Sequence, residues 1–164
     1  MEHFKHRFDR VEDYLHHRAP YLMVGSILSI EATRIMTQTE LSLDQFPFSG
    51  HFPGAPILPG AMMQEMTTQS AGILIAAEYN PMSEYDTHDP FHNPFALGVL
   101  VKVMQSRHRS FARPGDTLIA EVSLDSILGD VFEFRGKVTL KGRSIMSNHF
   151  RLANIPSGLL QGKS

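Results

Sequence analysis

The sequence has no cysteine, no long apolar run and little net charge. Without cysteine the chain can form neither a disulfide nor a thiolate metal site, and it has no cysteine nucleophile. No stretch reaches the ~20 apolar residues of a membrane span, and the charged start MEHFKHRFDRVEDYLHHR is unlike a secretory signal. The formal net charge of −2 favours neither nucleic acid nor an anionic membrane as a partner. We therefore expect a cytoplasmic protein with no nucleic-acid partner and no membrane span.

The chain has the size and composition of one ordinary globular domain. It contains 164 residues, of which 42% are hydrophobic and 20% charged, and this is enough to enclose a real core. No internal repeat or linker divides it. We predict a single domain over residues 1–164.

Two helices and a long loop are predicted from periodicity and composition. Phe8, Val11 and Leu15 recur at i, i+3 and i+7, which predicts a short leading helix over 8–16 with its apolar side inward. Residues 59–77 predict a central helix that is apolar almost all round, and such a helix is normally buried. Residues 78–96 contain three prolines and many polar groups, which predicts an irregular loop.

The remaining sequence predicts about six strands. TLIAEVSLD and VFEFRGKVTLKG alternate apolar and polar residues, as half-buried strands do, and the turn between them contains Gly129. Two more strands are expected in LVKVMQSRHRSF and SIMSNHFRLA, and another two fold back near Glu31–Ala32. Short connections favour antiparallel pairing. Because a helix that is apolar on every side cannot lie on a flat sheet, we predict an α+β fold whose curved sheet wraps the central helix.

The turn FSGHFPGAPILPG, residues 48–60, presents a candidate base. Its prolines and glycines stiffen the backbone around a single histidine, His51. Imidazole titrates near neutral pH without help, so His51 is a candidate proton acceptor whose orientation the turn fixes. The alternative is a structural histidine that hydrogen-bonds its own loop.

A candidate acid and an oxyanion donor follow in the central helix. Glu65 is its one carboxylate, and Gln69 at i+4 could orient it. A carboxyl group in apolar surroundings is suited to general-acid work, although Glu65 could also sit at a dimer seam or reach water. The N–H of Gly60 follows Pro59 at the positive helix end and could hold a developing oxyanion, unless Gly60 is merely a turn residue. Together these groups describe proton abstraction beside a polarised carbonyl, with loss or gain of water.

The run HFPGAPILPGAMMQEMTTQ, residues 51–69, closely resembles the signature of the FabZ-type 3-hydroxyacyl-acyl-carrier-protein dehydratases, a hotdog-fold family. The separation also matches, with 14 residues from His51 to Glu65 (65 − 51). The segments FDRVEDYLHHRAPYLMVG and RPGDTLIAEVSL resemble the family's sequences before and after this motif, and HHR is then part of a structural lead-in. An acid that is Glu and not Asp favours the FabZ type over the FabA type.

The resemblance implies a hotdog fold and a hydro-lyase that converts (3R)-3-hydroxyacyl thioesters on acyl carrier protein to trans-2-enoyl thioesters, in fatty-acid or related lipid synthesis. His51 would be the catalytic base and Glu65 the acid, meeting across a homodimer interface. Gly60 would polarise the thioester, and Phe52 and Gln69 would complete the substrate-binding residues. A phosphopantetheine arm carries the substrate, so neither metal nor diffusible cofactor is expected. A trimer of dimers is the larger assembly that the resemblance suggests.

Departures from the family pattern keep alternatives open. Gly25 stands where the family usually has Asp, Met66 where it usually has Ala, and segment 78–96 is longer than usual. The alternatives are another hotdog acyl-thioester enzyme, either a thioesterase or an enoyl hydratase, and a non-catalytic acyl-binding paralogue. The dehydratase is favoured because the spacing of the histidine and the acid matches its pattern.

Two further clusters of charged or titratable residues could bind a ligand or a partner. The segment THDPFHNPF offers two histidines and an aspartate, but its prolines disfavour a helix that presents both histidines on one face, so we expect a solvated loop and no metal site. Arg107, Arg109 and Arg113 form the densest basic cluster. They make either a solvated strand face or a docking patch for an acidic carrier protein.

Overall fold

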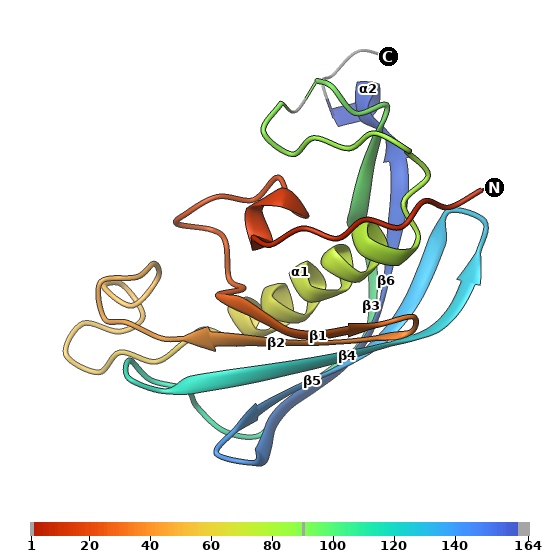
Figure 1. The fold of residues 1–164 in the computed structure, drawn as a ribbon. Helices are drawn as coiled ribbons and strands as arrows, with labels where there is room; N and C mark the ends of the chain where they lie inside the picture. The colour runs from red at the N-terminus through yellow and green to blue at the C-terminus, as the bar shows by residue number, and fades with distance from the viewer. Residues whose placement is uncertain (1, 90, 161–164) are drawn as a thin grey trace.

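The computed structural model describes residues 2–89 and 91–160. Figure 1 shows a curved sheet that wraps one long central helix, with the leading segment and the long loop on the helix's other side. The helices are a 3-10 helix η1 (Val11–Asp13), α1 (Gly60–Glu78) and a short α2 (Ser157–Leu160). The strands are β1 (Ser26–Glu31), β2 (Arg34–Glu40), β3 (Phe95–His108), β4 (Thr117–Leu128), β5 (Val131–Leu140) and β6 (Arg143–Pro156).

The six strands form one sheet in the order β1-β2-β4-β5-β6-β3, and every neighbouring pair is antiparallel. The alternation expected in β4 and β5 is confirmed, because Leu118, Ala120 and Val122 are buried on one strand and Phe132 and Phe134 on the other. The order leaves β1 and β3 as the two edges. This is the α+β hotdog arrangement that the sequence predicted.

Helix α1 follows Pro59 directly and is buried along its whole second half. Every residue from Met66 to Glu78 is buried, as the all-round apolar composition predicted. The helix begins at Gly60 and ends at Glu78, one residue later at each end than expected. Its last residue, Glu78, pairs with Lys5 and Arg7 from the N-terminal segment.

The leading segment differs from the helix predicted over 8–16. Only Val11–Asp13 is helical, and it forms a single 3-10 turn. The carbonyl of Phe8, which would accept from the chain four residues on in a helix, accepts instead from the Tyr14 hydroxyl at 3.2 Å. Too few residues remain to offset the cost of nucleating an α-helix. Val11 and Leu15 are nevertheless buried, so the inward apolar side was predicted correctly.

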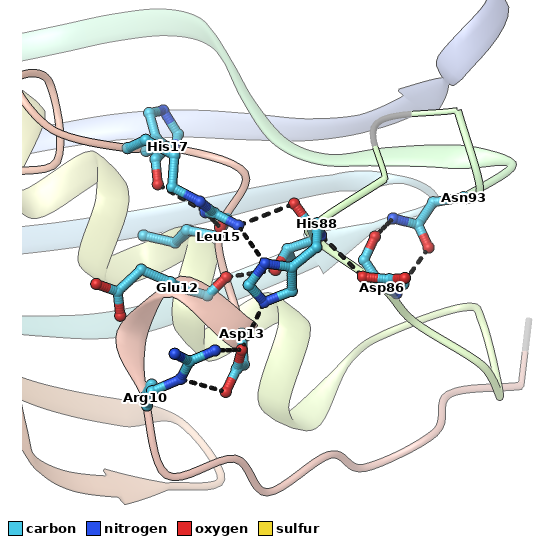
Figure 2. Close-up of polar contacts among 10 residues, drawn as sticks. Arg10, Glu12, Asp13, Leu15, His17, Asp86, His88 and Asn93 are labelled. Atoms are coloured by element: carbon cyan, nitrogen blue, oxygen red, sulfur yellow. Dashed lines mark hydrogen bonds and ion pairs between the residues drawn. The ribbon is translucent and has the colours of Figure 1, made fainter.

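The connection between α1 and β3, residues 79–94, is irregular as expected and is fastened to the leading segment. Figure 2 shows the imidazole of His88 beside Asp13, at 2.8 Å from Nε2 to Oδ1. The Thr87 hydroxyl donates to the carbonyl of Glu12, and the Tyr85 hydroxyl donates to the carbonyl of Tyr14 at 2.9 Å. The loop is therefore a packed part of the domain that covers one side of α1.

The ends of the predicted domain at residue 1 and residues 161–164 lie outside the described residues, as does position 90 of the predicted loop. Within the part of the chain that is described, no helix combines the length and the apolar character needed to cross a membrane.

Candidate active site

The turn before α1 holds His51 in one orientation. Its Nδ1 lies 3.0 Å from the carbonyl oxygen of Ile57, and the N–H of Ile57 returns a bond of 2.9 Å to the carbonyl of His51. A carbonyl can only accept, so Nδ1 carries the proton and Nε2 presents a lone pair. The ring stacks on Phe52, which is exposed, with 4.2 Å between centroids. His51 thus bonds its own loop in the tautomer that a general base requires.

Glu65 lies in the second turn of α1 with its side chain 15% exposed. The predicted partner is present, because Nε2 of Gln69 donates to Oε1 of Glu65 at 2.9 Å. Gln69 is itself fixed by two backbone groups. It accepts from the N–H of Met23 at 2.7 Å and donates to the carbonyl of Tyr21 at 2.9 Å. The carboxylate is therefore oriented by an amide that cannot turn freely.

An apolar cavity of about 840 Å³ opens beside this carboxylate. Glu65, Gln69 and Gly72 line it from one face of α1, at the i, i+4 and i+7 spacing that places side chains together. The leading segment, the 79–94 loop and the first half of β3 supply the other walls, through residues that include Leu15, Tyr85, Phe95, Leu97 and Val99. The cavity has the size and apolar lining of a site for a small molecule or an acyl chain.

A single chain does not bring the predicted residues into one place. Within the described residues, Glu65 and Gln69 line the cavity, whereas His51, Phe52 and Gly60 do not. The cavity lies against β3, which is an edge strand of the described sheet, and Leu100, Val101 and Val103 of this strand are exposed.

Gly60 is the first residue of α1. The first N–H groups that bond within the helix are those of Met62 and Met63, which both donate to the carbonyl of Pro59. The ring of His108 packs against Gly60 so closely that a Cβ on Gly60 would lie 2.9 Å from its Cε1. His108 is exposed, so a side chain at Gly60 would have to displace its ring, whereas glycine leaves the ring in place.

Two residues that the sequence analysis did not single out as site residues lie beside Glu65. His17 and Tyr21 line the same cavity, and Nε2 of His17 lies 3.7 Å from Oε1 of Glu65. Burial lowers the pKa of His17, against the opposing effect of Glu65. Burial also raises the pKa of Tyr21, and the charge of Glu65 adds to this. The only signal in the sequence was the HHR run, which the resemblance explained as a structural lead-in.

Among the described residues of THDPFHNPF, Thr87 and Asn93 are buried, so the segment is not the wholly solvated loop that was expected. His88 pairs with Asp13, and the carboxylate of Asp89 accepts from the N–H of Phe91. Elsewhere in the described residues, three possible metal ligands have donor atoms within 4.8 Å of one another, namely Asp125, Glu133 and His149. Arg135 and Arg151 already pair with the two carboxylates. This group is a surface ion-pair network on β4, β5 and β6.

Comparison with known proteins identifies a family and relatives of this chain. The model of the ApeI-like family, described as ApeI dehydratase, matches residues 28–148. The FabZ 3-hydroxyacyl-[acyl-carrier-protein] dehydratase of Rickettsia massiliae (strain Mtu5) is 27% identical over 141 residues, covering 85% of this chain and 90% of that protein. The FabZ of Rickettsia bellii (strain OSU 85-389) is 26% identical over the same shares.

Solved structures share the fold. The dehydratase heterocomplex ApeI:P from Xenorhabdus doucetiae superposes with a TM-score of 0.76 at 21% identity, over 94% of this chain and 97% of that one. The PaaI protein of E. coli superposes with a TM-score of 0.58 at 8% identity, over 78% and 81%. The family model matches residues 28–148, which is most of this chain. The chain therefore belongs to the ApeI-like dehydratase family, and it has the hotdog fold.

Proposed function

We propose that this protein removes water from (3R)-3-hydroxyacyl thioesters carried on acyl carrier protein and forms trans-2-enoyl thioesters, in fatty-acid or related lipid synthesis. The observation that carries the proposal is Glu65, a carboxylate oriented by Gln69 at the wall of an apolar cavity of about 840 Å³. The names of the FabZ relatives support the carrier-bound substrate.

The reaction needs one base and one acid. Nε2 of His51 takes the proton from C2, and the imidazolium that forms keeps its Nδ1–H bond to the carbonyl of Ile57. Glu65, a carboxylate in the free protein, is protonated in the complex with substrate and gives that proton to the C3 hydroxyl, which leaves as water while the C2–C3 double bond forms. The N–H of Gly60, at the positive end of α1, polarises the thioester carbonyl and stabilises the negative charge on its oxygen. Phe52 and Gln69 line the path of the substrate.

The second half of each site comes from a second copy of the chain. In the described part of one chain, the cavity that Glu65 lines does not include His51, and the β3 edge of the sheet lies against this cavity. Pairing of two β3 edges would cover the exposed apolar residues Leu100, Val101 and Val103 and bring a second chain to this cavity. A homodimer with shared sites is therefore the unit proposed, with three such dimers as a larger assembly. A phosphopantetheine arm delivers the substrate, so the reaction requires no metal or diffusible cofactor.

The carrier protein would dock beside the turn that holds His51. Arg113 lines a groove of about 340 Å³ together with Ala55, Pro56 and Ile57. The carbonyl of Ile57 accepts the hydrogen bond of the His51 ring, so the groove lies beside this turn. Arg107 and Arg109 are exposed at the nearby end of β3. A positive surface here suits an acidic carrier, and its affinity should weaken as salt screens the charges.

The test is a spectrophotometric dehydration assay on carrier-linked 3-hydroxyacyl thioesters of several lengths, with free-thiol release followed in parallel. We expect loss of the hydroxyacyl substrate without thiol release, and loss of turnover in folded, dimeric His51→Ala and Glu65→Gln variants. Thiol release that depends on both residues would identify a thioesterase instead. Tight acyl binding without turnover would identify a non-catalytic paralogue.

A further inference from the structure

The leading segment brings a second titratable group to the acid. Nε2 of His17 lies 3.7 Å from Oε1 of Glu65, which is the same oxygen that accepts the hydrogen bond of Gln69. His17 and Glu65 border one cavity, and the His17 ring lies nearly parallel to that of Tyr21, with 6.1 Å between centroids. Two nitrogen groups therefore approach one carboxylate oxygen and leave Oε2 free of both.

The turn that carries His17 is held by the guanidinium of its neighbour Arg18. Nη1 of Arg18 donates to the carbonyls of Leu15 and His17, at 2.6 and 2.8 Å. Nη2 of the same guanidinium donates to the carbonyl of Thr87 at 3.1 Å and lies 3.3 Å from Nδ1 of His88. Figure 2 shows this network between the stretch of Leu15 and His17 and the imidazole of His88, with the His17 ring pointing away from His88. The long 79–94 loop thus helps to hold the turn from which His17 reaches Glu65.

The surroundings of His17 favour a neutral ring with its proton on Nε2. Burial lowers the pKa of His17 and the positive charge of Arg18 adds to this, while Glu65 opposes both. Its Nδ1 is buried and has no hydrogen-bond partner among the described residues. A proton on Nδ1 would remain unpaired there and would turn the Nε2 lone pair toward a carboxylate. A proton on Nε2 points at Oε1.

We propose that His17 is a positioning residue for Glu65, donating from Nε2 to Oε1 so that Oε2 faces the C3 hydroxyl of the substrate. This inference rests on the proposed function. The separation of 3.7 Å is longer than a hydrogen bond, and contacts of this kind commonly tighten when substrate binds. After Glu65 has given up its proton, His17 and Gln69 both stabilise the carboxylate that remains.

The first test compares His17→Leu, which removes the donor, with His17→Gln, which keeps an N–H donor at similar reach. His92→Leu is the matched control, since His92 is an exposed histidine of the same loop network and is not among the residues that line the cavity. A hydrogen bond to a charged group is worth about tenfold to a hundredfold. We therefore expect kcat to fall by that factor in His17→Leu with KM within about twofold, and to recover to within about threefold of wild type in His17→Gln. Equal loss in the Leu and Gln variants, or unchanged kcat in His17→Leu, overturns the proposal.

The second test needs no turnover and separates this proposal from the proposed function. NMR titration of the His17 ring is compared in the wild-type protein and in Glu65→Gln. Because Glu65 acts to raise the pKa of His17, its neutralisation should lower that pKa further. An unchanged titration overturns the positioning role. A shifted titration in a protein that dehydrates no thioester keeps the contact and refutes the proposed function alone.

Discussion

Gln69 lies one helical turn beyond Glu65 and donates to its carboxylate at 2.9 Å. The same amide accepts from the N–H of Met23 and donates to the carbonyl of Tyr21, so both of its amide protons and its oxygen are engaged. It therefore connects the central helix to the segment before β1. One buried side chain supports both the fold and the orientation of the acid.

Replacement of Gln69 should thus reduce both stability and activity. Gln69→Leu leaves the buried N–H of Met23 without its partner and removes the partner of the Tyr21 carbonyl, which belongs to an exposed residue, at a cost of about 1–3 kcal/mol in the free energy of unfolding. We also expect kcat to fall by at least about tenfold, since Glu65 loses a donor. Urea denaturation and the dehydration assay measure the two effects. Gln45→Ala on the exposed surface is the control, and a Gln69→Leu protein as stable as that control would contradict the assignment.

The sheet packs closely on α1 at Gly136. A Cβ there would lie 2.3 Å from Oδ1 of Asn148 and 3.0 Å from Cγ2 of Thr67. Asn148 donates to Thr67 and Gln64 on α1, so Gly136→Ala must displace a side chain that joins β6 to the helix. We expect a loss of about 1–3 kcal/mol in the free energy of unfolding. The matched control is Gly50→Ala, because a Cβ at Gly50 meets nothing within 4 Å. If the two variants are equally stable to heat, the close contact of Gly136 with Asn148 and Thr67 is contradicted.

The ion pairs of Glu78 should contribute to stability at neutral pH. Its side chain is 3% exposed, and Nζ of Lys5 lies 2.9 Å from Oε2. Burial acts to raise the pKa of Glu78, but Lys5 and Arg7 outweigh it and the net pKa is lowered. Since the folded pKa lies below the ordinary value, this contribution is present above the ordinary value of 4.5 and is lost as the pH falls through the folded pKa.

Lys5→Met combined with Arg7→Met leaves the Glu78 carboxylate buried and unpaired. We expect a cost of about 2–3 kcal/mol at pH 7, less than for a fully buried pair because both cations reach solvent. Adding Glu78→Gln to this double variant should recover most of the loss. Denaturation at pH 7 and pH 3.5 measures these differences. If the double variant is as stable as wild type at pH 7, the ion pairs contribute nothing.

Much of this fold can be predicted because its patterns are local. Alternation in β4 and β5 places Leu118 and Phe134 in the core, and the apolar surround of α1 requires a sheet that curves. The 3-10 turn at Val11–Asp13 was not predictable from periodicity, since the Phe8 backbone bonds to the phenol of Tyr14. The contact between His17 and Glu65 was missed for a similar reason, because it joins residues 48 positions apart (65 − 17) through tertiary packing. Local sequence specifies each group but not its partner.

The central claim is that His51 of one chain works with Glu65 of another. Subunit complementation tests it most directly. His51→Ala and Glu65→Gln are each expected to be inactive, and the two are mixed, unfolded and refolded together. Random pairing places half of the chains in mixed dimers, each with one intact site and one site lacking both groups, so about a quarter of wild-type activity should return.

The control mixes His51→Ala with the double variant His51→Ala/Glu65→Gln, which can assemble no intact site. Recovery of about a quarter of the activity in the first mixture and none in the control is the predicted result. If the first mixture stays inactive although mixed dimers form, the two residues do not act across the interface, and the shared site is contradicted.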